Sequence, residues 1–475
     1  MLLLKEGSQS IKDSLYSHLP KPPHMYSSRR TFLRQSLAVS AGFVGLSSYL
    51  SNARSIAPTD WSPTKQWLEL PEGFTAKIIS RWGEKMSDGF FVPNRHDGMA
   101  AFDVNSQVVL VRNHENSPTP TEFGPFKGDN VLFQKLAKAN FFDYGSGEKP
   151  GLGGTTTVVY DEATQTVKEQ YLSLIGTNRN CAGGPTPWNT WISCEEDVTP
   201  AGEGHETAHG YNFEIPAGGK GLIDPVPLRA MGRFNHEAVC VDPTTSIVYQ
   251  TEDQGDSLIY RFIPNTPEKL QQGGILQALV VEGQHMLDTR NWEEQAIAVN
   301  QPVAVRWITL EDVEPTEDDL RLRGHAAGAA LFARGEGMWF GNNEVYFACT
   351  NGGRELAGQV FKYIPSPYEG TSREKEAPGT LTLFAEPNDT DLLKSCDNLT
   401  VAPWGDVVLV EDKADSHIRG ITPEGNIYTI GRNVGSDSEL AGACFSPSGQ
   451  TFFVNVQNEG LTLAVTGPWE KLRQT

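Results

Sequence analysis

The chain of 475 residues carries 59 Asp and Glu side chains against 39 Lys and Arg, which gives a formal net charge of −20. So acidic a chain lacks the basic face that binding to phosphates of nucleic acid requires, and this excludes a nucleic-acid partner. Hydrophobic residues make up 38% of the sequence, enough to bury a core, which excludes a disordered chain. The 47 glycines and 30 prolines favour many short strands joined by turns.

The first segment of the chain has the pattern of an export signal. Residues 28–34 read Ser-Arg-Arg-Thr-Phe-Leu-Arg, and an apolar stretch rich in small residues follows over 36–50. This order is typical of a twin-arginine signal peptide. The stretch of about 15 residues is shorter than the roughly 20 that span a bilayer. We predict a twin-arginine signal peptide over 1–57, a single mature domain over 58–475, a periplasmic or secreted protein, and no stable insertion into a membrane.

The charge of the mature chain indicates bound cations. Residues 1–57 hold seven basic and two acidic side chains, so their removal leaves a net charge of about −25. Mutual repulsion among so many carboxylates destabilises a compact chain unless cations offset it. The twin-arginine route, which exports proteins already folded in the cytoplasm, often around a cofactor, agrees with this expectation. The six cysteines do not indicate a disulfide framework, because a chain of this size needs none; Cys194, Cys240 and Cys349 lie in apolar runs and are predicted to be buried thiols.

A repeated sequence pattern begins at residue 180. Each copy consists of a small or acidic residue, an apolar run, a turn, a second apolar run and a polar pair. A looser copy runs from His96 to Glu115. Six such units of three or four antiparallel strands predict an all-β fold, a six-bladed β-propeller, with loop and short-helix insertions over one face at 117–150 and 265–333. A sandwich with repeated turns is the alternative. The opening and closing residues, each 15 positions apart, are Cys181 and Glu196, Glu237 and Glu252, Glu336 and Asn351, Asp397 and Asp412, and Gly442 and Gln457.

The spacing predicts where the polar ends of these units meet. In a propeller the first strand of each blade lines the central channel, and 15 residues make two strands with a tight turn, so both ends return to one mouth of the channel. The side chains expected there are Asp97, His114, Glu115, Cys181, Glu195, Glu196, Glu237, Glu252, Asp253, Glu336, Asp397, Glu411 and Asp412.

So many carboxylates in one partly dehydrated space need protons or cations. Oxygen ligands favour Ca²⁺ or Mg²⁺, and the added thiolate of Cys181 favours a transition metal such as iron or zinc. Arg334 precedes Glu336 by two positions, so both face the same way on a strand, as recognition of an anionic substrate would need. The alternatives are carboxylates that cap turns on an exposed rim, and a structural salt bridge at Arg334.

Four segments carry a specific combination of residues. Residues 180–196 read Asn-Cys-Ala-Gly-Gly-Pro-Thr-Pro-Trp-Asn-Thr-Trp-Ile-Ser-Cys-Glu-Glu, and 235–238, 334–337 and 397–399 read Asn-His-Glu-Ala, Arg-Gly-Glu-Gly and Asp-Asn-Leu. In these segments, and in its leader, the chain resembles the PhoX-type alkaline phosphatases. The resemblance implies a six-bladed propeller that holds Fe³⁺ and Ca²⁺ at its channel mouth and hydrolyses phosphomonoesters.

The resemblance also implies roles for single residues. Cys181 would be the thiolate ligand of iron, Glu196 a bridging carboxylate, and Arg334 the clamp on the phosphate. The catalytic residues that we predict are Arg334, Glu336 and Glu196. The first unit fits the family pattern poorly, and the last offers only Gly442 and Gln457. The predicted metal ligands are Cys181, Glu195, Glu196, Glu237, Glu252, Glu336, Asp397 and Asp412.

These observations together predict an exported, metal-dependent phosphomonoesterase that acts as a monomer on a small phosphorylated substrate. Two other functions remain open on the same fold. One is a calcium-dependent lactonase or esterase, and the other is a non-enzymatic binding propeller stabilised by calcium.

Overall fold

The computed structural model describes residues 61–63 and 67–472. These residues belong to one compact unit, Ala53–Thr475. The predicted signal peptide over 1–57 lies outside the described residues. Within the described ranges, no helix combines the length and the apolar character that crossing a membrane requires.

The described residues form five antiparallel sheets and a few short helices, which confirms the all-β prediction. Two of the sheets are built from strands that follow one another along the chain, as expected for hairpins joined by turns. The first contains β4 (His96–Val104), β5 (Gln107–His114), β6 (Gly153–Asp161) and β7 (Thr166–Thr177), and the second contains β8 (Asn180–Pro185), β9 (Thr190–Glu195) and β10 (Asn212–Pro216).

A nine-stranded sheet joins two meanders at their outer edges. Strand β15 pairs with β14 of one meander and with β19 of the other, so the two share one hydrogen-bonded sheet. The first meander consists of β11 (His236–Val241), β12 (Val248–Glu252), β13 (Tyr260–Pro264) and β14 (Gly274–Val281); β15 spans Val303–Thr309; the second consists of β16 (Gly335–Gly341), β17 (Glu344–Cys349), β18 (Gln359–Ile364) and β19 (Thr380–Ala385).

Strands from both ends of the described chain complete the last two sheets. Strand β3 (Thr75–Arg81) pairs with β26, and β2 (Leu68–Pro71), which carries β1 (Trp61–Pro63), pairs with β23. The chain is therefore closed on itself by non-local pairing. The remaining strands are β20 (Cys396–Val401), β21 (Val407–Glu411), β22 (His417–Ile421) and β23 (Ile427–Asn433), then β24 (Leu440–Phe445), β25 (Thr451–Val456) and β26 (Leu461–Thr466).

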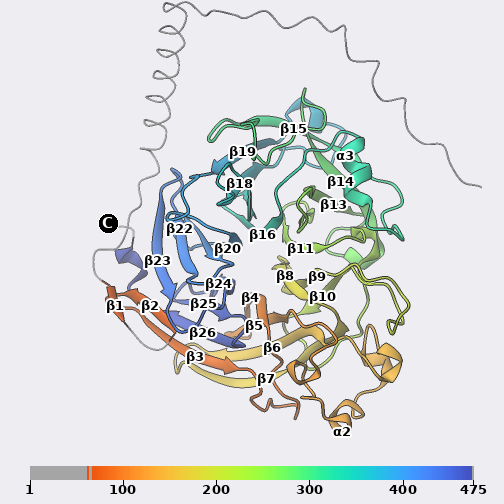
Figure 1. Cartoon of the computed structure of the whole chain (residues 1–475), viewed down its shortest axis with the longest axis vertical. Helices are drawn as coiled ribbons and strands as arrows, with labels where there is room; N and C mark the ends of the chain where they lie inside the picture. Colours follow the sequence, from red (N-terminus) through yellow and green to blue (C-terminus); the bar gives the residue numbers. More distant parts are fainter. Residues whose placement is uncertain (1–60, 64–66, 473–475) are drawn as a thin grey trace, which may run out of the picture. The chain divides into compact units, whose positions relative to one another are not determined.

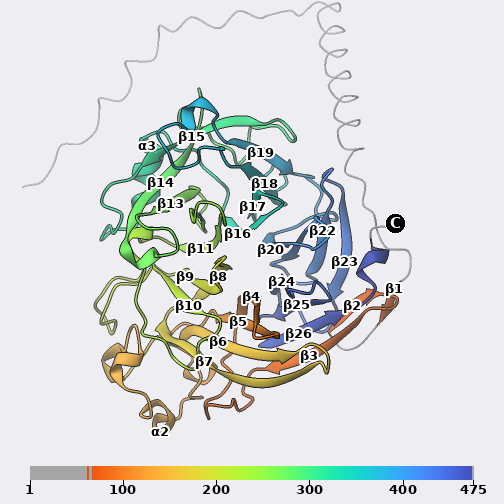
Figure 2. The same ribbon diagram turned by 180° about the vertical axis from the view of Figure 1, so that it is seen from behind.

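The first strand of each repeated unit lies innermost. Strands β4, β8, β11, β16, β20 and β24 contact one another in this order, and β24 contacts β4, which closes a ring. Figure 1 and, from behind, Figure 2 show these strands around the centre with the later strands outside them. The arrangement is propeller-like. Small residues allow the inner strands to lie this close together. A Cβ atom on Gly98 of β4 would lie 2.5 Å from the Cα of Ala182 in β8, which is too close for any side chain.

Apolar side chains fill the spaces between neighbouring sheets. One cluster joins Tyr249 of β12 to Phe347 and Phe361 of the next meander, and the two phenylalanine rings stack with centroids 5.2 Å apart. Burial of these large rings supplies much of the hydrophobic stabilisation that holds the sheets together.

The two predicted insertions differ in character. The interval 117–150 contains only loops and short helices, as predicted. The interval 265–333 also contains β14 and β15, so the prediction of an insertion was wrong for that part; its run Gly-Ile-Leu-Gln-Ala-Leu-Val-Val is apolar enough to complete a sheet. The helices are η1 (Thr121–Phe123), α2 (Asn130–Phe133), η2 (Lys138–Asn140), η3 (Gly145–Gly147), η4 (Arg229–Met231), η5 (Leu270–Gln272), α3 (Leu320–Ala326), η6 (Glu374–Glu376) and η7 (Trp469–Lys471).

Candidate metal centre

Each innermost strand of the described chain has an irregularity near its start. The pairing of β4 with β5 shifts between His96 and Met99, and the pairing of β11 with β12 shifts between His236 and Val239. The other four inner strands shift at the equivalent place. A bulge leaves a residue unpaired and redirects its side chain. These bulges contain the opening residues of all six repeated units, which are Asp97, Cys181, Glu237, Glu336, Asp397 and Gly442.

The bulges bring opening residues close to one another and to two residues, Glu115 and Glu196, that directly follow second strands. Two groups have one possible ligand atom per residue within 4.8 Å of one another. Glu115, Cys181 and Glu196 form the first group, and Glu237, Glu336 and Asp397 form the second. Five of the eight predicted ligands thus lie in these two groups, together with Glu115.

The other three predicted ligands, Glu195, Glu252 and Asp412, lie outside these groups. Glu195 and Glu252 are the last residues of β9 and β12 and pair with Asn180 and His236, so the residue that follows each of them takes the closing position. Glu195 accepts hydrogen bonds from His209 and from three backbone N–H groups. Glu252 accepts a 2.7 Å hydrogen bond from the Tyr260 hydroxyl.

The register explains which residue closes each unit. In the first five units the backbone N–H of the closing residue donates to the carbonyl two positions before the opening residue, as Glu196 does to Arg179 and Asp412 does to Ser395; in the last unit Gln457 donates to Glu439, three positions before Gly442. The same rule makes Thr350 the closing residue of the fourth unit, so the prediction of Asn351 was wrong. In the third unit, the N–H that donates to the carbonyl of Asn235 belongs to Asp253, because the two paired strand ends are one residue further apart in the sequence there. A spacing of 15 residues therefore predicted Glu252 in place of Asp253.

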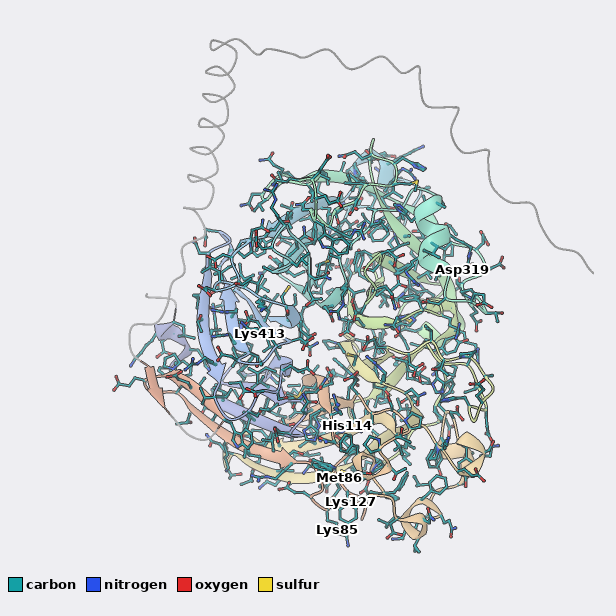
Figure 3. The ribbon with its side chains drawn as sticks, in the orientation of Figure 1. Lys85, Met86, His114, Lys127, Asp319 and Lys413 are labelled. Carbon is teal, nitrogen blue, oxygen red and sulfur yellow. The ribbon has the colours of Figure 1, made fainter. Side chains whose placement is uncertain are left out.

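Two further residues expected at the mouth face other partners. Glu411 accepts hydrogen bonds from His417 and Arg419 and forms an ion pair with Lys413 at 3.0 Å. The His114 ring is buried between the carbonyl of Asn94 and the hydroxyl of Thr156. Figure 3 labels His114 below the centre of the molecule and Lys413 to the left of it.

Arginines occupy an equivalent position on three units, two residues before the opening residue. Arg95, Arg179 and Arg334 all have the left-handed backbone conformation, with φ of 51°, 46° and 53°. Each side chain contacts the closing residue of the preceding unit: Arg95 contacts Gln457, Arg179 contacts Glu115 at 3.0 Å, and Arg334 contacts Asp253. The guanidinium of Arg179 also contacts Glu196.

Arg334 directly precedes β16 and has a left-handed backbone, so the prediction that it lies on one strand with Glu336 was wrong; its side chain nevertheless contacts both Asp253 and Glu336. Its Nε and Nη2 donate to the two oxygens of Asp253 at 2.7 and 2.6 Å, and Nη2 lies 3.2 Å from Oε1 of Glu336. The bidentate contact fixes the plane of the guanidinium. The Arg334 side chain is 37% exposed, whereas Glu336 and Asp253 are almost buried. Arg334 is thus anchored and still accessible to a ligand.

Glu439 was missed by the sequence reasoning, although it lies just before the opening residue Gly442. Its backbone carbonyl accepts a hydrogen bond from the closing residue Gln457, as the carbonyls of the arginines do in other units. Its carboxyl group is in hydrogen-bond contact with that of Asp412. Burial, a hydrogen bond with Asp412 and the charges of Asp397 and Asp97 raise the pKa of Glu439 to about 11. A cation would remove this repulsion.

Glu237 gives the clearest indication that the cluster is built for cations. It is fully buried, and neither of its carboxylate oxygens has a hydrogen-bond partner among the described residues. An unpaired buried carboxylate costs several kcal/mol, so a proton or a metal ion must compensate it. Burial, followed by neighbouring carboxylates, raises the pKa of Glu237, Glu336 and Asp397 well above the usual range.

All six cysteines are free, and only Cys181 is not fully buried. This confirms the buried thiols at Cys194, Cys240 and Cys349. The sulfur of Cys181 lies 4.0 Å from Oδ2 of Asp97. Burial and then the charges of Asp97, Glu237 and Glu196 raise the pKa of the thiol, so a thiolate here requires a cation.

The fold and the cluster define a propeller-like protein whose inner strands present carboxylates, one thiol and arginines at a single centre. The sequence model of the family "Alkaline phosphatase PhoX" matches residues 56–165 and 159–460. The chain belongs to the PhoX alkaline phosphatase family.

Other comparisons add no functional information. No curated protein matches the chain. A gluconolactonase from Xanthomonas campestris has 11% identity and a TM-score of 0.38, covering 86% of this chain and 99% of its own. A Bacteroides thetaiotaomicron protein of unknown function has 10% identity and a TM-score of 0.42, and the match covers 83% of this chain and 76% of that protein. A Trichoderma reesei carbohydrate-active enzyme of family AA12 has 9% identity and a TM-score of 0.31, over 87% and 100%. These similarities are too low to support an argument.

Proposed function

We propose that this protein is an exported phosphomonoesterase, a six-bladed propeller that uses iron and calcium ions at the centre of its ring. Family membership supports the reaction class. The observation that carries the proposal is the anchored guanidinium of Arg334, which lies 3.2 Å from Glu336 at the edge of a buried carboxylate cluster. This arrangement suits an anionic oxygen of the substrate beside bound cations.

The residues present fit the proposed ions. Glu115, Cys181 and Glu196 would hold iron, because one thiolate among carboxylates suits a transition metal. Glu237, Glu336 and Asp397 would hold calcium, which prefers oxygen ligands. When bound, such ions neutralise charge on the phosphoryl oxygens and lower the pKa of an attacking water.

The chain itself would orient the substrate. Arg334 donates to a phosphoryl oxygen with the N–H groups that its contacts with Asp253 leave free. Asp253 keeps the guanidinium in one plane, and Glu336 ties it to the second carboxylate group. Arg179, held by Glu115 and Glu196, offers a second guanidinium beside the first group. Both guanidinium groups would offset negative charge on the transferred group.

The remaining features of the proposal concern the protein in the cell. We expect export through the twin-arginine machinery to the periplasm or the exterior, as a monomer, with the ions bound before export. The ring of six inner strands supports six blades, with the two meanders of the nine-stranded sheet counted separately.

Release of phosphate from a generic aryl phosphate tests the proposal. Protein purified without chelator should hydrolyse it, lose activity in excess chelator, and regain activity with iron and calcium together. A lactone and a neutral aryl ester serve as comparison substrates. Hydrolysis of the lactone or the neutral ester without phosphate release would identify a lactonase or esterase. If the protein hydrolyses none of the three substrates, a non-enzymatic binding propeller is the function that remains.

A further inference from the structure

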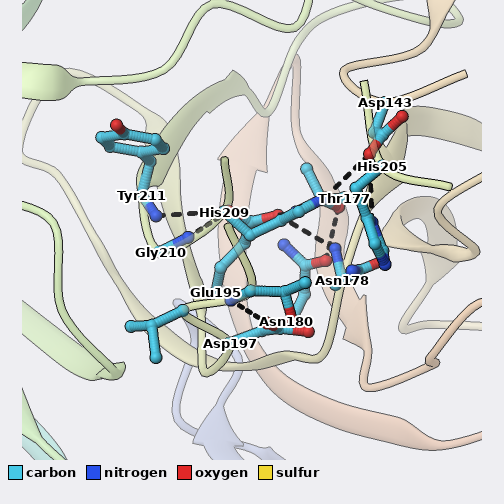
Figure 4. Close-up of polar contacts among 12 residues, drawn as sticks. Asp143, Thr177, Asn178, Asn180, Glu195, Asp197, His205, His209, Gly210 and Tyr211 are labelled. Carbon is cyan, nitrogen blue, oxygen red and sulfur yellow. Dashed lines mark hydrogen bonds and ion pairs between the residues drawn. The ribbon is translucent and has the colours of Figure 1, made fainter. Parts of the chain in front are cut away.

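A separate group of metal-binding side chains lies away from the strand starts that form the centre. Asp143 lies in the interval 117–150, and His205 and His209 lie in the loop between β9 and β10. Their ligand atoms are within 4.8 Å of one another. Figure 4 shows the two imidazoles beside the carboxylate, with Glu195 on the other side of His209.

The carboxylate of Asp143 is fixed by backbone groups. Its Oδ1 accepts hydrogen bonds from the N–H groups of Gly145 at 2.7 Å and Glu206 at 3.1 Å. Its Oδ2 lies 3.2 Å from the same N–H of Glu206 and 3.1 Å from both Nδ1 of His205 and Nε2 of His209. Three potential ligand atoms thus converge from two segments that are distant in sequence.

Glu195 controls the tautomer of His209. Its Oε1 lies 2.7 Å from Nδ1 of His209 and accepts a hydrogen bond from the Asn178 N–H, while Oε2 accepts from the N–H groups of Gly210 and Tyr211. A carboxylate held in this way keeps a proton on Nδ1. The second nitrogen, Nε2, lies 3.1 Å from Oδ2 of Asp143. Although burial lowers it, the carboxylates of Glu195 and Asp143 raise the pKa of His209 to about 10, so a metal ion would displace a proton from Nε2 and bind there, as in carboxylate–histidine–metal arrangements.

The charges also match a divalent cation. Asp143 and Glu195 supply two negative charges within a buried space, and His209 between them is fully buried. Two neutral imidazoles and one divalent ion would bring the net charge of the group to zero. Protons on both imidazoles would give the same net charge, so a divalent ion would take the place of two protons. Imidazole nitrogens favour zinc and similar transition metals over calcium.

We propose that Asp143, His205 and His209 form a second metal site, for Zn²⁺ or a similar transition-metal ion, separate from the central cluster. The site fastens the interval 117–150 to the loop that follows β9. It also holds Glu195, and therefore the strand end from which Glu196 extends into the centre. His205 is 19% exposed, which leaves one side open for entry of the ion.

Zinc titration tests this site apart from the central one. The parent for the test is the Cys181→Ser protein in excess calcium, in which the central thiol is removed and the oxygen sites are filled. We expect calorimetry to show one tightly bound zinc in this parent. His205→Ala should weaken that binding at least ~100-fold, whereas His285→Ala, which alters an exposed histidine outside the group, should leave it unchanged.

Two further readouts test the assignment. Glu195→Gln keeps a hydrogen-bond acceptor for His209 but removes the charge, and should weaken zinc binding by about 10- to 100-fold. Co²⁺ in place of zinc should give the visible absorption of a site with nitrogen ligands, lost in His205→Ala. Equal zinc binding by His205→Ala and its parent, or none in the parent, would show that the group is only a hydrogen-bonded ion cluster. Neither result depends on phosphatase activity.

Discussion

The carboxyl groups of Asp412 and Glu439 face each other in hydrogen-bond contact, at a place where other units of the ring pair an arginine with an acid. Two ionised carboxylates cannot remain so close in a buried space. Either a proton or a cation must lie between them. This pair therefore links the stability of the protein to both pH and bound metal.

Removal of metal should make the stability of the protein depend on pH. Burial raises the pKa of Glu196 to about 7 in spite of Arg179, from its ordinary value of 4.5. The folded state then binds more protons between these values, so the free energy of unfolding falls as pH rises. For Glu196 alone the loss is about 3 kcal/mol.

The measurement is the melting temperature in excess chelator from pH 5 to pH 9. We expect a steady fall, and a much flatter profile after calcium and iron are restored. Binding to the folded state alone adds about 2.7 kcal/mol at a hundredfold excess over the dissociation constant. A melting temperature independent of chelator would contradict a metal-filled centre.

Glu237→Gln should have opposite effects on the two forms of the protein. At pH 8 the substitution removes a buried carboxyl that has no hydrogen-bond partner among the described residues, so the chelated protein should gain about 1–3 kcal/mol. The stabilisation by added calcium should shrink. Chemical denaturation with and without calcium measures both. A chelated variant less stable than the chelated wild type would argue that Glu237 has a structural partner.

Cys181→Ser should lose a bound transition metal and any visible absorption that arises from thiolate coordination. Cys444→Ala, which alters a buried thiol in β24, is the control and should keep both. Elemental analysis and the visible spectrum are the measurements. Unchanged iron content in Cys181→Ser would remove the thiol from the ligand set.

Arg334→Ala should leave the metals in place and lower kcat/KM for an aryl phosphate. Loss of a charge-assisted contact in a site of low dielectric costs roughly 2–4 kcal/mol, or about 30- to 1,000-fold. Arg334→Lys should recover only part of this, because an ammonium group cannot reproduce the planar fork. Arg323→Ala, at an arginine of α3 that pairs with Asp319 just before the helix, is the control. Full activity of Arg334→Ala would make the arginine a structural partner only.

The sequence by itself determined the all-β class and the centre of the ring. Repeated apolar runs fixed the hairpins, and the opening residues Cys181, Glu237, Glu336 and Asp397 were found because each begins a strand in the same phase. Local patterning carries this information, since strand alternation and turn residues act over a few positions.

Only the tertiary structure decided which acid of each closing pair faces the centre. The extra residue between β11 and β12 selects Asp253 over Glu252, and a change of one position along a strand reverses the direction of a side chain. Sequence spacing also gave no sign of Glu439, whose partner Asp412 comes from another sheet, nor of the meeting of Asp143 with His205 and His209. Those contacts depend on how separate segments pack, which the pattern within any one segment does not encode.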